Sequence, residues 1–162
     1  MRFIIVLILV FFALSIFAAC SEDSGMYLHV TEVTMRLEGE NATFDLNYTL
    51  DTFARIYIMA LGCRYLEPEL ISFLGGYSEV ELVRADIDGA SLHVKGAGKY
   101  NSGYYLFDST PFGSIEAVRR EAIPSFSVVY PGGRIRTFYN VTATQNVFSE
   151  ASDPLPASTR KK

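Results

Sequence analysis

Thr43-Phe44-Asp45-Leu46-Asn47-Tyr48-Thr49-Leu50 is the stretch of sequence that decides the fold class. Its apolar side chains recur at every second position, and polar side chains fill the positions between them. Successive side chains of a strand point to opposite faces of a sheet, so this period of two predicts a strand with one buried face. We expect Phe44, Leu46, Tyr48 and Leu50 to line that face.

Further strands are predicted on both sides of this stretch. Residues 27–37 are rich in β-branched and aromatic side chains and lead into the turn sequence EGEN at 38–41. The dipeptide Asp88-Gly89 is a signal for a two-residue hairpin. The other predicted strands are 79–85, 91–95, 104–107, 126–130 and 135–144, together with 53–61, whose apolar character on both faces predicts a central strand containing Ile56 and Ile58.

Two segments break the strand pattern. Residues 67–74 are predicted to form a short helix, because Pro68 suits the first helical turn and Gly75 suits the position after the last. Residues 114–122 are a second helix candidate, which would end before Pro124. Residues 96–100 are expected to be a flexible connection.

The predicted fold class is therefore mainly β. Seven to eight short strands separated by turns, with one or two short helices, predict an antiparallel β-sandwich or a strongly bent sheet. An N-terminal hydrophobic signal or anchor helix is expected to precede this fold.

The first 20 residues are predicted to direct the chain out of the cytoplasm. Arg2 precedes residues 3–19, which carry no charged side chain, and small residues stand before Cys20. A basic head, an apolar stretch and a sharp polar switch are the parts of an export signal. Two routes stay open: residues 17–20 (FAAC) resemble the lipobox of lipoproteins, which would place lipid on Cys20, or the segment remains as an uncleaved anchor helix. Either route leaves Ser21 onward outside the cell, and we favour a membrane-tethered form over a freely secreted one.

Three parts are expected after this segment: a short linker at 21–26, one β-rich extracytoplasmic domain at 27–148 and a disordered tail at 149–162. Arg2 is the only charged residue of the first 20, so 13 of the 14 basic residues and all 18 acidic residues follow it, with a net charge of −5. This acidity argues against a nucleic-acid partner.

Cysteine occurs only at Cys20 and Cys63. If Cys20 carries lipid, Cys63 is expected to be a buried free thiol; if Cys20 keeps its thiol, a disulfide between the two is an open alternative. A disulfide-rich scaffold is excluded.

No catalytic, cofactor or metal motif is found in the sequence. Asp86-Ile87-Asp88-Gly89 lacks the later acidic positions of a calcium loop, and His29 and His93 lack accompanying ligands. We therefore predict no enzymatic activity, no cofactor and no metal site.

Three N-glycosylation patterns fit an exported surface and are expected on wet faces. They begin at Asn41, Asn47 and Asn140.

A face for a partner is predicted on the hairpin that joins residues 126–130 to 135–144. A two-residue loop at 132–133 pairs Phe126 with Tyr139 on the side toward the core. The opposite side is the candidate partner face, and its residues are Val129, Arg136 and Phe138.

Residues 104–109 (YYLFDS), 129–133 (VYPGG) and 136–140 (RTFYN) carry a resemblance to small uncharacterised exported proteins of methanogenic archaea. It covers mainly the chain after about Tyr57 and includes no catalytic motif. The resemblance implies an archaeal cell surface and no known activity.

These patterns predict a membrane-tethered extracytoplasmic β-domain with a structural or protein-binding role at the cell surface. The membrane is the expected partner of the N-terminus, a cell-surface protein is the other candidate partner, and the oligomeric state stays open. The alternatives are a small-ligand or carbohydrate binder and, third, a hydrolase without a recognisable motif. The binder would use exposed tyrosines, of which the candidates are Tyr77, Tyr100, Tyr104 and Tyr105. A flat apolar strip would favour protein binding, a concave aromatic pocket a ligand, and paired carboxylates or a nucleophile beside a base a hydrolase.

Overall fold

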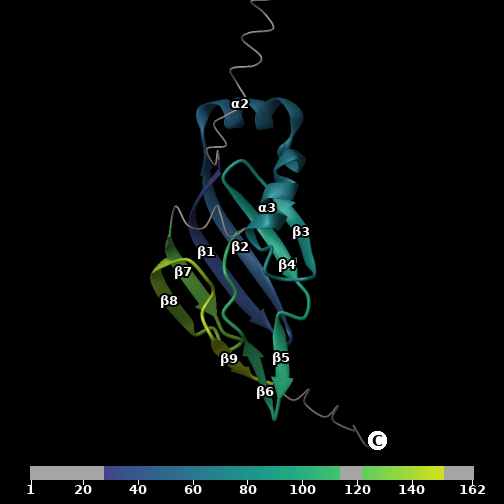
Figure 1. The fold of residues 1–162 in the computed structure, drawn as a ribbon, viewed down its shortest axis with the longest axis vertical. Coiled ribbons are helices and arrows are strands. Elements are labelled where there is room, and N and C mark those ends of the chain that lie inside the picture. Colours follow the sequence, from purple (N-terminus) through teal and green to yellow (C-terminus); the bar gives the residue numbers. More distant parts are fainter. Residues whose placement is uncertain (1–27, 114–121, 152–162) are drawn as a thin grey trace, which may run out of the picture.

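A computed structural model describes residues 28–113 and 122–151 of the chain (Figure 1). The predicted signal or anchor with Cys20, the linker at 21–26, almost all of the helix candidate at 114–122 and the tail from residue 152 lie outside the described residues. Strands dominate the described part, which confirms a mainly β fold.

The elements follow one another along the chain as β1 Leu28–Glu38, β2 Asn41–Leu50, α2 Thr52–Leu61, the 3-10 helix η1 Cys63–Leu66, α3 Glu67–Phe73, β3 Val80–Ala85, β4 Gly89–Val94, β5 Gly98–Asn101, β6 Tyr104–Phe107, β7 Ile123–Val129, β8 Ile135–Val141 and β9 Val147–Glu150. The strands form two sheets. The larger has six strands in the order β3-β4-β2-β1-β7-β8, and the smaller has three in the order β5-β6-β9.

The six-stranded sheet is mixed, although an antiparallel arrangement was the prediction. Strands β1 and β7 pair in parallel, with Val33 opposite Phe126 and Met35 opposite Val128, while the other pairs are antiparallel. An alternating pattern of apolar residues is the same in either direction, so it carries no information on strand direction. The long connection between β1 and β7 supplies the crossover that a parallel neighbour requires.

Strand β2 confirms the period of two that opened the sequence. Phe44, Leu46 and Tyr48 are buried, Leu50 is half-buried, and the intervening Asn47 is exposed. β2 lies between β1 and β4, so both of its edges are paired within the sheet. Burial of its core face supports the sheet through contiguous apolar packing.

Residues 53–61 form a helix, so the prediction of a central strand there is wrong. Helix α2 begins because Asp51 acts as its N-cap: the Ala54 backbone N–H donates to Asp51 Oδ1 at 2.7 Å. It ends at Gly62, whose φ of 94° is open to glycine and strained for other residues. Ile58 is buried as expected, but Ile56 is exposed. A run that is apolar on every side fits a helix as readily as a strand, and only the cap distinguishes them.

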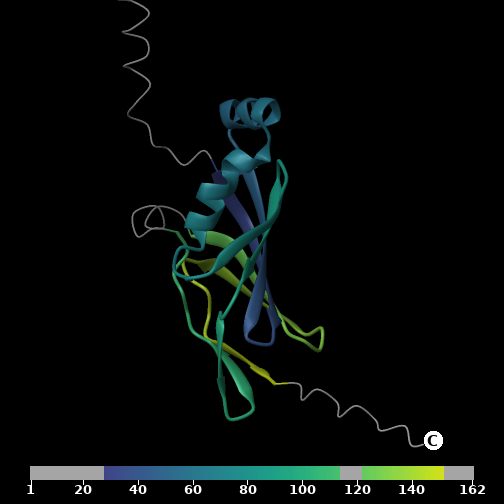
Figure 2. The same ribbon diagram turned by 90° about the vertical axis from the view of Figure 1, so that its right-hand side faces the viewer.

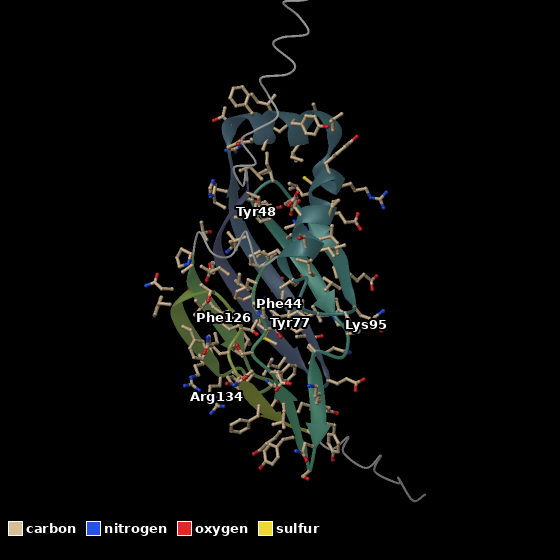
Figure 3. All side chains as sticks on the ribbon, viewed as in Figure 1. Phe44, Tyr48, Tyr77, Lys95, Phe126 and Arg134 are labelled. Atoms are coloured by element: carbon tan, nitrogen blue, oxygen red, sulfur yellow. The ribbon has the colours of Figure 1, made fainter. Side chains whose placement is uncertain are left out.

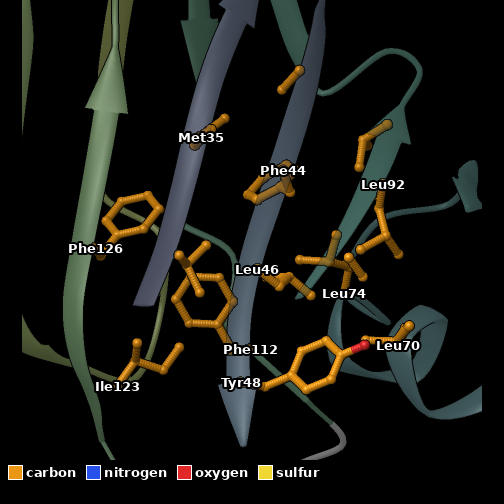
Figure 4. Close-up of a cluster of buried hydrophobic side chains, with 14 of the residues drawn as sticks. Met35, Phe44, Leu46, Tyr48, Leu70, Leu74, Leu92, Phe112, Ile123 and Phe126 are labelled. Carbon is orange, nitrogen blue, oxygen red and sulfur yellow. The ribbon is translucent and has the colours of Figure 1, made fainter. Parts of the chain in front are cut away.

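Helix α3 covers one face of the six-stranded sheet, as Figure 2 shows. The prediction of a helix at 67–74 is confirmed within one residue. In Figure 4, Leu70 and Leu74 lie beside Leu46 and Tyr48 of β2, and all four are buried. The core therefore sits between the sheet and this helix.

The remaining cover of the core comes from the segments between the two sheets. Phe112 is buried, stacks on Phe73 with ring centroids 5.2 Å apart, and meets Phe126 of β7 edge-on at 5.7 Å. Phe107 of β6 and Val147 of β9 are also buried in this core. The three-stranded sheet is thereby packed against the larger one.

Several boundaries differ from the predicted ones. The β3–β4 hairpin is confirmed, but its loop is 86–88 and Gly89 already belongs to β4. Residues 98–100, expected in a flexible connection, belong to strand β5. Strand β9 runs to Glu150, two residues beyond the predicted domain limit at 148, and its Ser149 is buried.

Candidate functional site

The β7–β8 hairpin decides where the predicted partner face lies. Its loop closes with the Tyr130 N–H donating to the Arg134 carbonyl at 2.9 Å, so three residues rather than two form the turn. Pro131 fits the second position of a type I turn, and Gly133 follows with a φ of 78°. The structure therefore pairs Phe126 with Phe138, where the two-residue loop predicted Tyr139.

This shift of one residue exchanges the two sides of β8. Phe138 is half-buried, packs against the core and stacks on Phe126 with ring centroids 6.0 Å apart. The Arg136 guanidinium lies over the Phe138 ring, 5.0 Å from its centroid. Phe138 is thus part of the core edge, and the predicted register that turned its ring outward is wrong.

The exposed side of β8 is the side that was predicted to face the core. Tyr139 is 71% exposed and Ile135 is also exposed, while Val129, opposite Ile135, is half-buried. Figure 3 shows the contrast within this region: Phe126 points into the body of the protein and Arg134 lies at its margin. Val129 is the one predicted partner-face residue that stays on the outer side.

An exposed apolar strip lies on the three-stranded sheet. Cross-strand pairs place Leu106 opposite Phe148 and Tyr104 opposite Glu150, and residues 104 and 106 share a face because they are two apart. All three apolar side chains are exposed, Phe148 by 62%, and the Tyr104 and Phe148 rings meet edge-on at 6.0 Å. We call Tyr104, Leu106 and Phe148 the distal strip. No sequence signal singled it out, since β9 was not predicted.

The candidate tyrosines divide between core and surface. Tyr77 packs on Phe44 with ring centroids 5.5 Å apart, its hydroxyl lies 3.4 Å from Thr144 Oγ1, and burial raises its pKa. In Figure 3 the labelled Tyr77 lies beside Phe44 within the body of the protein. Tyr105 is half-buried, so only Tyr100 and Tyr104 expose their rings broadly.

A second apolar surface lies at the other end of the molecule, on helix α2. Its large exposed side chains, together with one from η1, are Phe53, Ile56, Tyr57, Met59, Leu61 and Tyr65. Tyr57 and Tyr65 meet edge-on, with centroids 5.6 Å apart, so the surface continues from α2 onto η1.

The three glycosylation candidates differ in their surroundings. Asn47 is exposed, and its amide donates to Glu32 Oε2 at 3.0 Å. Asn140 is exposed with a left-handed φ of 53°, a conformation that Asn tolerates better than most residues. Asn41 is half-buried, and its side-chain oxygen accepts the Gly96 N–H at 3.0 Å.

Two surface hollows combine polar and apolar walls. One, of about 470 Å³, lies between η1 and β3 and includes Cys63, Arg64 and Glu67. The Cys63 thiol is free and half-buried, and its only potential disulfide partner, Cys20, lies outside the described residues. The other, of about 400 Å³, includes Glu40, Glu79 and Lys95. Neither hollow has an aromatic lining.

Histidine, cysteine and acidic side chains in the described residues form no group of three or more that could hold a metal ion. His93 lies with its Nδ1 3.3 Å from Thr43 Oγ1 on the outer face of the sheet. None of the helices in the described part of the chain has the length and apolar character needed to cross a bilayer.

Comparison of the chain with protein-family models, with curated proteins and with solved structures found no match.

Proposed function

We propose that this protein is a membrane-tethered extracytoplasmic β-domain that binds a protein partner at the cell surface and has no enzymatic role. The observation that carries the proposal is the distal strip, an exposed row of two aromatic rings and a leucine. Aromatic side chains are enriched at the centres of protein interfaces. Side chains exposed on one face of a sheet suit the surface of a protein better than a small ligand, which binds in a concave site.

The position of the distal strip relative to the N-terminus also supports this proposal. Leu28 begins β1 at one end of the sheet, and the β1–β2 turn lies at the other, where the Glu40 carbonyl accepts the Gly98 N–H at 2.8 Å. Ten residue steps along β1 correspond to about 33 Å. Figure 1 shows the three-stranded sheet at the end opposite α2. A tether at the N-terminus would therefore leave the distal strip facing away from the membrane.

Binding of a carbohydrate is the second candidate function. The exposed rings of Tyr100 and Tyr104 at the same end of the molecule favour it, since tyrosine offers an apolar face and a polar hydroxyl. The two residues belong to neighbouring strands but to opposite faces of the small sheet, because Tyr100 pairs with Tyr105. This separation makes a shared stacking platform the weaker proposal.

The experiment is a pull-down from detergent-solubilised native membrane with the full chain as bait. Leu106→Ser with Phe148→Ser removes the distal strip, and Ile135→Ser with Tyr139→Ser is the matched control on exposed strand residues elsewhere. We expect a co-purifying protein to disappear only with the strip variant. Retention of the same partner by the strip variant, or equal loss from both, would contradict the proposal.

The tether is tested separately with Cys20→Ser. If Cys20 carries lipid, the variant is released from the membrane or accumulates unprocessed, since durable attachment needs the added acyl chains. If the variant stays in the membrane with an intact N-terminus, the uncleaved helix is the anchor. A wild-type chain found entirely outside the membrane fraction would refute the tether in both forms.

A further inference from the structure

Helix α2 turns its apolar side outward, the reverse of an ordinary surface helix. At about 100° per residue, Met59, Ile56, Ala60, Phe53 and Tyr57 follow one another around a continuous outward arc. Phe53 is 85% exposed and Met59 is 72% exposed. A helix on the surface of a soluble protein normally shows charged residues on this side. The apolar arc therefore needs a partner.

The side of the helix that faces the domain is the one opposite the apolar arc. Ile58 on that side is buried in the core. Asp51 caps the first turn, and the Gly62 N–H donates to the Ile58 carbonyl at 2.7 Å, so both ends of the helix are closed. The apolar arc thus points away from the core, and Figures 1 and 2 show α2 lying across one end of the molecule.

That end is where the chain enters the domain. Leu28, the first described residue, pairs with Leu50, and α2 begins two residues after Leu50. Seven residues, 21–27, separate Cys20 from Leu28. Eight residue steps reach at most about 28 Å when fully extended. The apolar segment at 3–19 would therefore hold the bilayer close to this end of the domain.

The composition of the surface fits a bilayer interface. Tyr57 and Tyr65 have amphipathic rings of the kind enriched at the level of the lipid headgroups. Arg55 of α2 and Arg64 of η1 are exposed, and cations near a bilayer are attracted to anionic headgroups. Asp51 places one exposed carboxylate at the start of α2, where it accepts the Ala54 N–H.

We infer that α2 lies flat on the membrane that tethers the chain, with its apolar arc buried in the lipid interface and the distal strip directed away. This inference rests on the proposed tether, and it adds a second attachment that sets the orientation of the domain. Ten residues of helix are far too short to cross a bilayer but are enough for an interfacial helix, whose attachment scales with the apolar area that it buries.

The absence of tryptophan from the chain allows a clean test. Phe53→Trp and Met59→Trp place a fluorophore on the apolar arc, and Phe148→Trp places a control fluorophore on the distal strip, where the native side chain is also exposed. Each full chain is reconstituted into vesicles of phosphatidylcholine and phosphatidylglycerol, with or without bromine on the acyl chains. Because an interfacial helix sits about 5–10 Å into the headgroup and acyl boundary, we expect blue-shifted emission and about twofold quenching by bromine at 53 and 59 only.

Other results overturn the inference in distinguishable ways. If the chain floats with the vesicles while Trp at 53 and 59 stays unquenched and unshifted like Trp at 148, the tether stands and the role of α2 is refuted. Blue-shifted emission without quenching shows that a second copy or residues 3–19 cover the arc in place of lipid. Failure of the wild-type chain to float with the vesicles refutes the tether and, with it, this inference.

Discussion

Replacing Phe138 with alanine tests the register of the β7–β8 hairpin and, with it, which side of β8 belongs to the core. The structure pairs Phe138 with Phe126 and places its ring against the core edge. The neighbouring Tyr139 is 71% exposed on the opposite side. Two adjacent residues should therefore respond differently to the same substitution.

The expected magnitude follows from the contacts of the Phe138 ring. Full burial of a phenylalanine side chain contributes about 1.5–3 kcal/mol, so a half-buried ring accounts for about 1–1.5 kcal/mol. The stacking contact with Phe126 adds about 0.5–1.5 kcal/mol. We expect Phe138→Ala to lower the free energy of unfolding by about 1.5–3 kcal/mol. Tyr139→Ala should change it by about 0.5 kcal/mol or less, as is usual for an exposed position.

The assay is urea and thermal denaturation of the domain expressed from Ser24 onward, without the apolar N-terminal segment. A loss of about 1.5–3 kcal/mol should lower Tm by about 5–15 °C in a domain of this size. The m-value should stay constant, because a change in it would signal an altered unfolded state rather than a lost contact.

The opposite result would refute the register. A large loss of stability in Tyr139→Ala with little change in Phe138→Ala would place Tyr139 inside and restore a two-residue loop at 132–133. Equal effects would show that β8 does not hold a single register against β7. Random-coil far-UV dichroism of the unsubstituted domain would contradict its independent folding.

Two further predictions concern the core. Leu46→Ala should lower the free energy of unfolding by about 2–5 kcal/mol in urea denaturation, because Leu46 is 1% exposed. The control Leu106→Ala, at an exposed position, should lower it far less. Equal effects of the two substitutions would contradict the burial of the core face of β2. Burial raises the pKa of Tyr48 above its ordinary value of 10.0. The unfolded chain therefore loses this proton at a lower pH than the folded protein does. The stability that depends on the protonated hydroxyl is fully present below about pH 10 and is lost as the pH rises further. Tyr48→Phe should remove that part of the alkaline loss of stability, and it should cost about 1–3 kcal/mol at neutral pH because the Asp86 carbonyl loses a hydrogen bond of 2.6 Å. Thermal melts at neutral pH and at several alkaline pH values measure both effects. An identical alkaline loss of stability in the variant would refute the role of Tyr48.

The two helices α3 and α2 show what local sequence patterns can and cannot predict. Residues 67–74 carry proline and acidic side chains where a helix starts, and Gly75 follows where it stops; the prediction of a helix there is confirmed. Residues 53–61 have no polar face, so their period cannot distinguish a buried strand from a helix with an outward apolar side. Asp51, the N-cap, was the one local signal for a helix. A helix whose apolar arc faces away from the core could not be predicted from an alternating strand pattern.

The distal strip and the exposed side of β8 could not be predicted from the sequence, because both depend on how distant or neighbouring strands pair. The distal strip joins Tyr104 and Leu106 to Phe148, which lies some forty residues later in the chain. The predicted partner face failed because the turn at 131–133 holds one more residue than the dipeptide signal implied, and a shift of one reverses every side chain of β8.

By itself the sequence determined the mainly β character, the core face of β2, the helix at α3 and the approximate positions of the β1–β2, β3–β4 and β7–β8 hairpins, because each depends on side chains within a few residues of one another. Tertiary structure alone decided the parallel pairing of β1 with β7, the burial of Phe138, and the placement of α2 and the distal strip at opposite ends. These depend on contacts between segments distant along the chain, and on a register in which a single residue exchanges inside for outside.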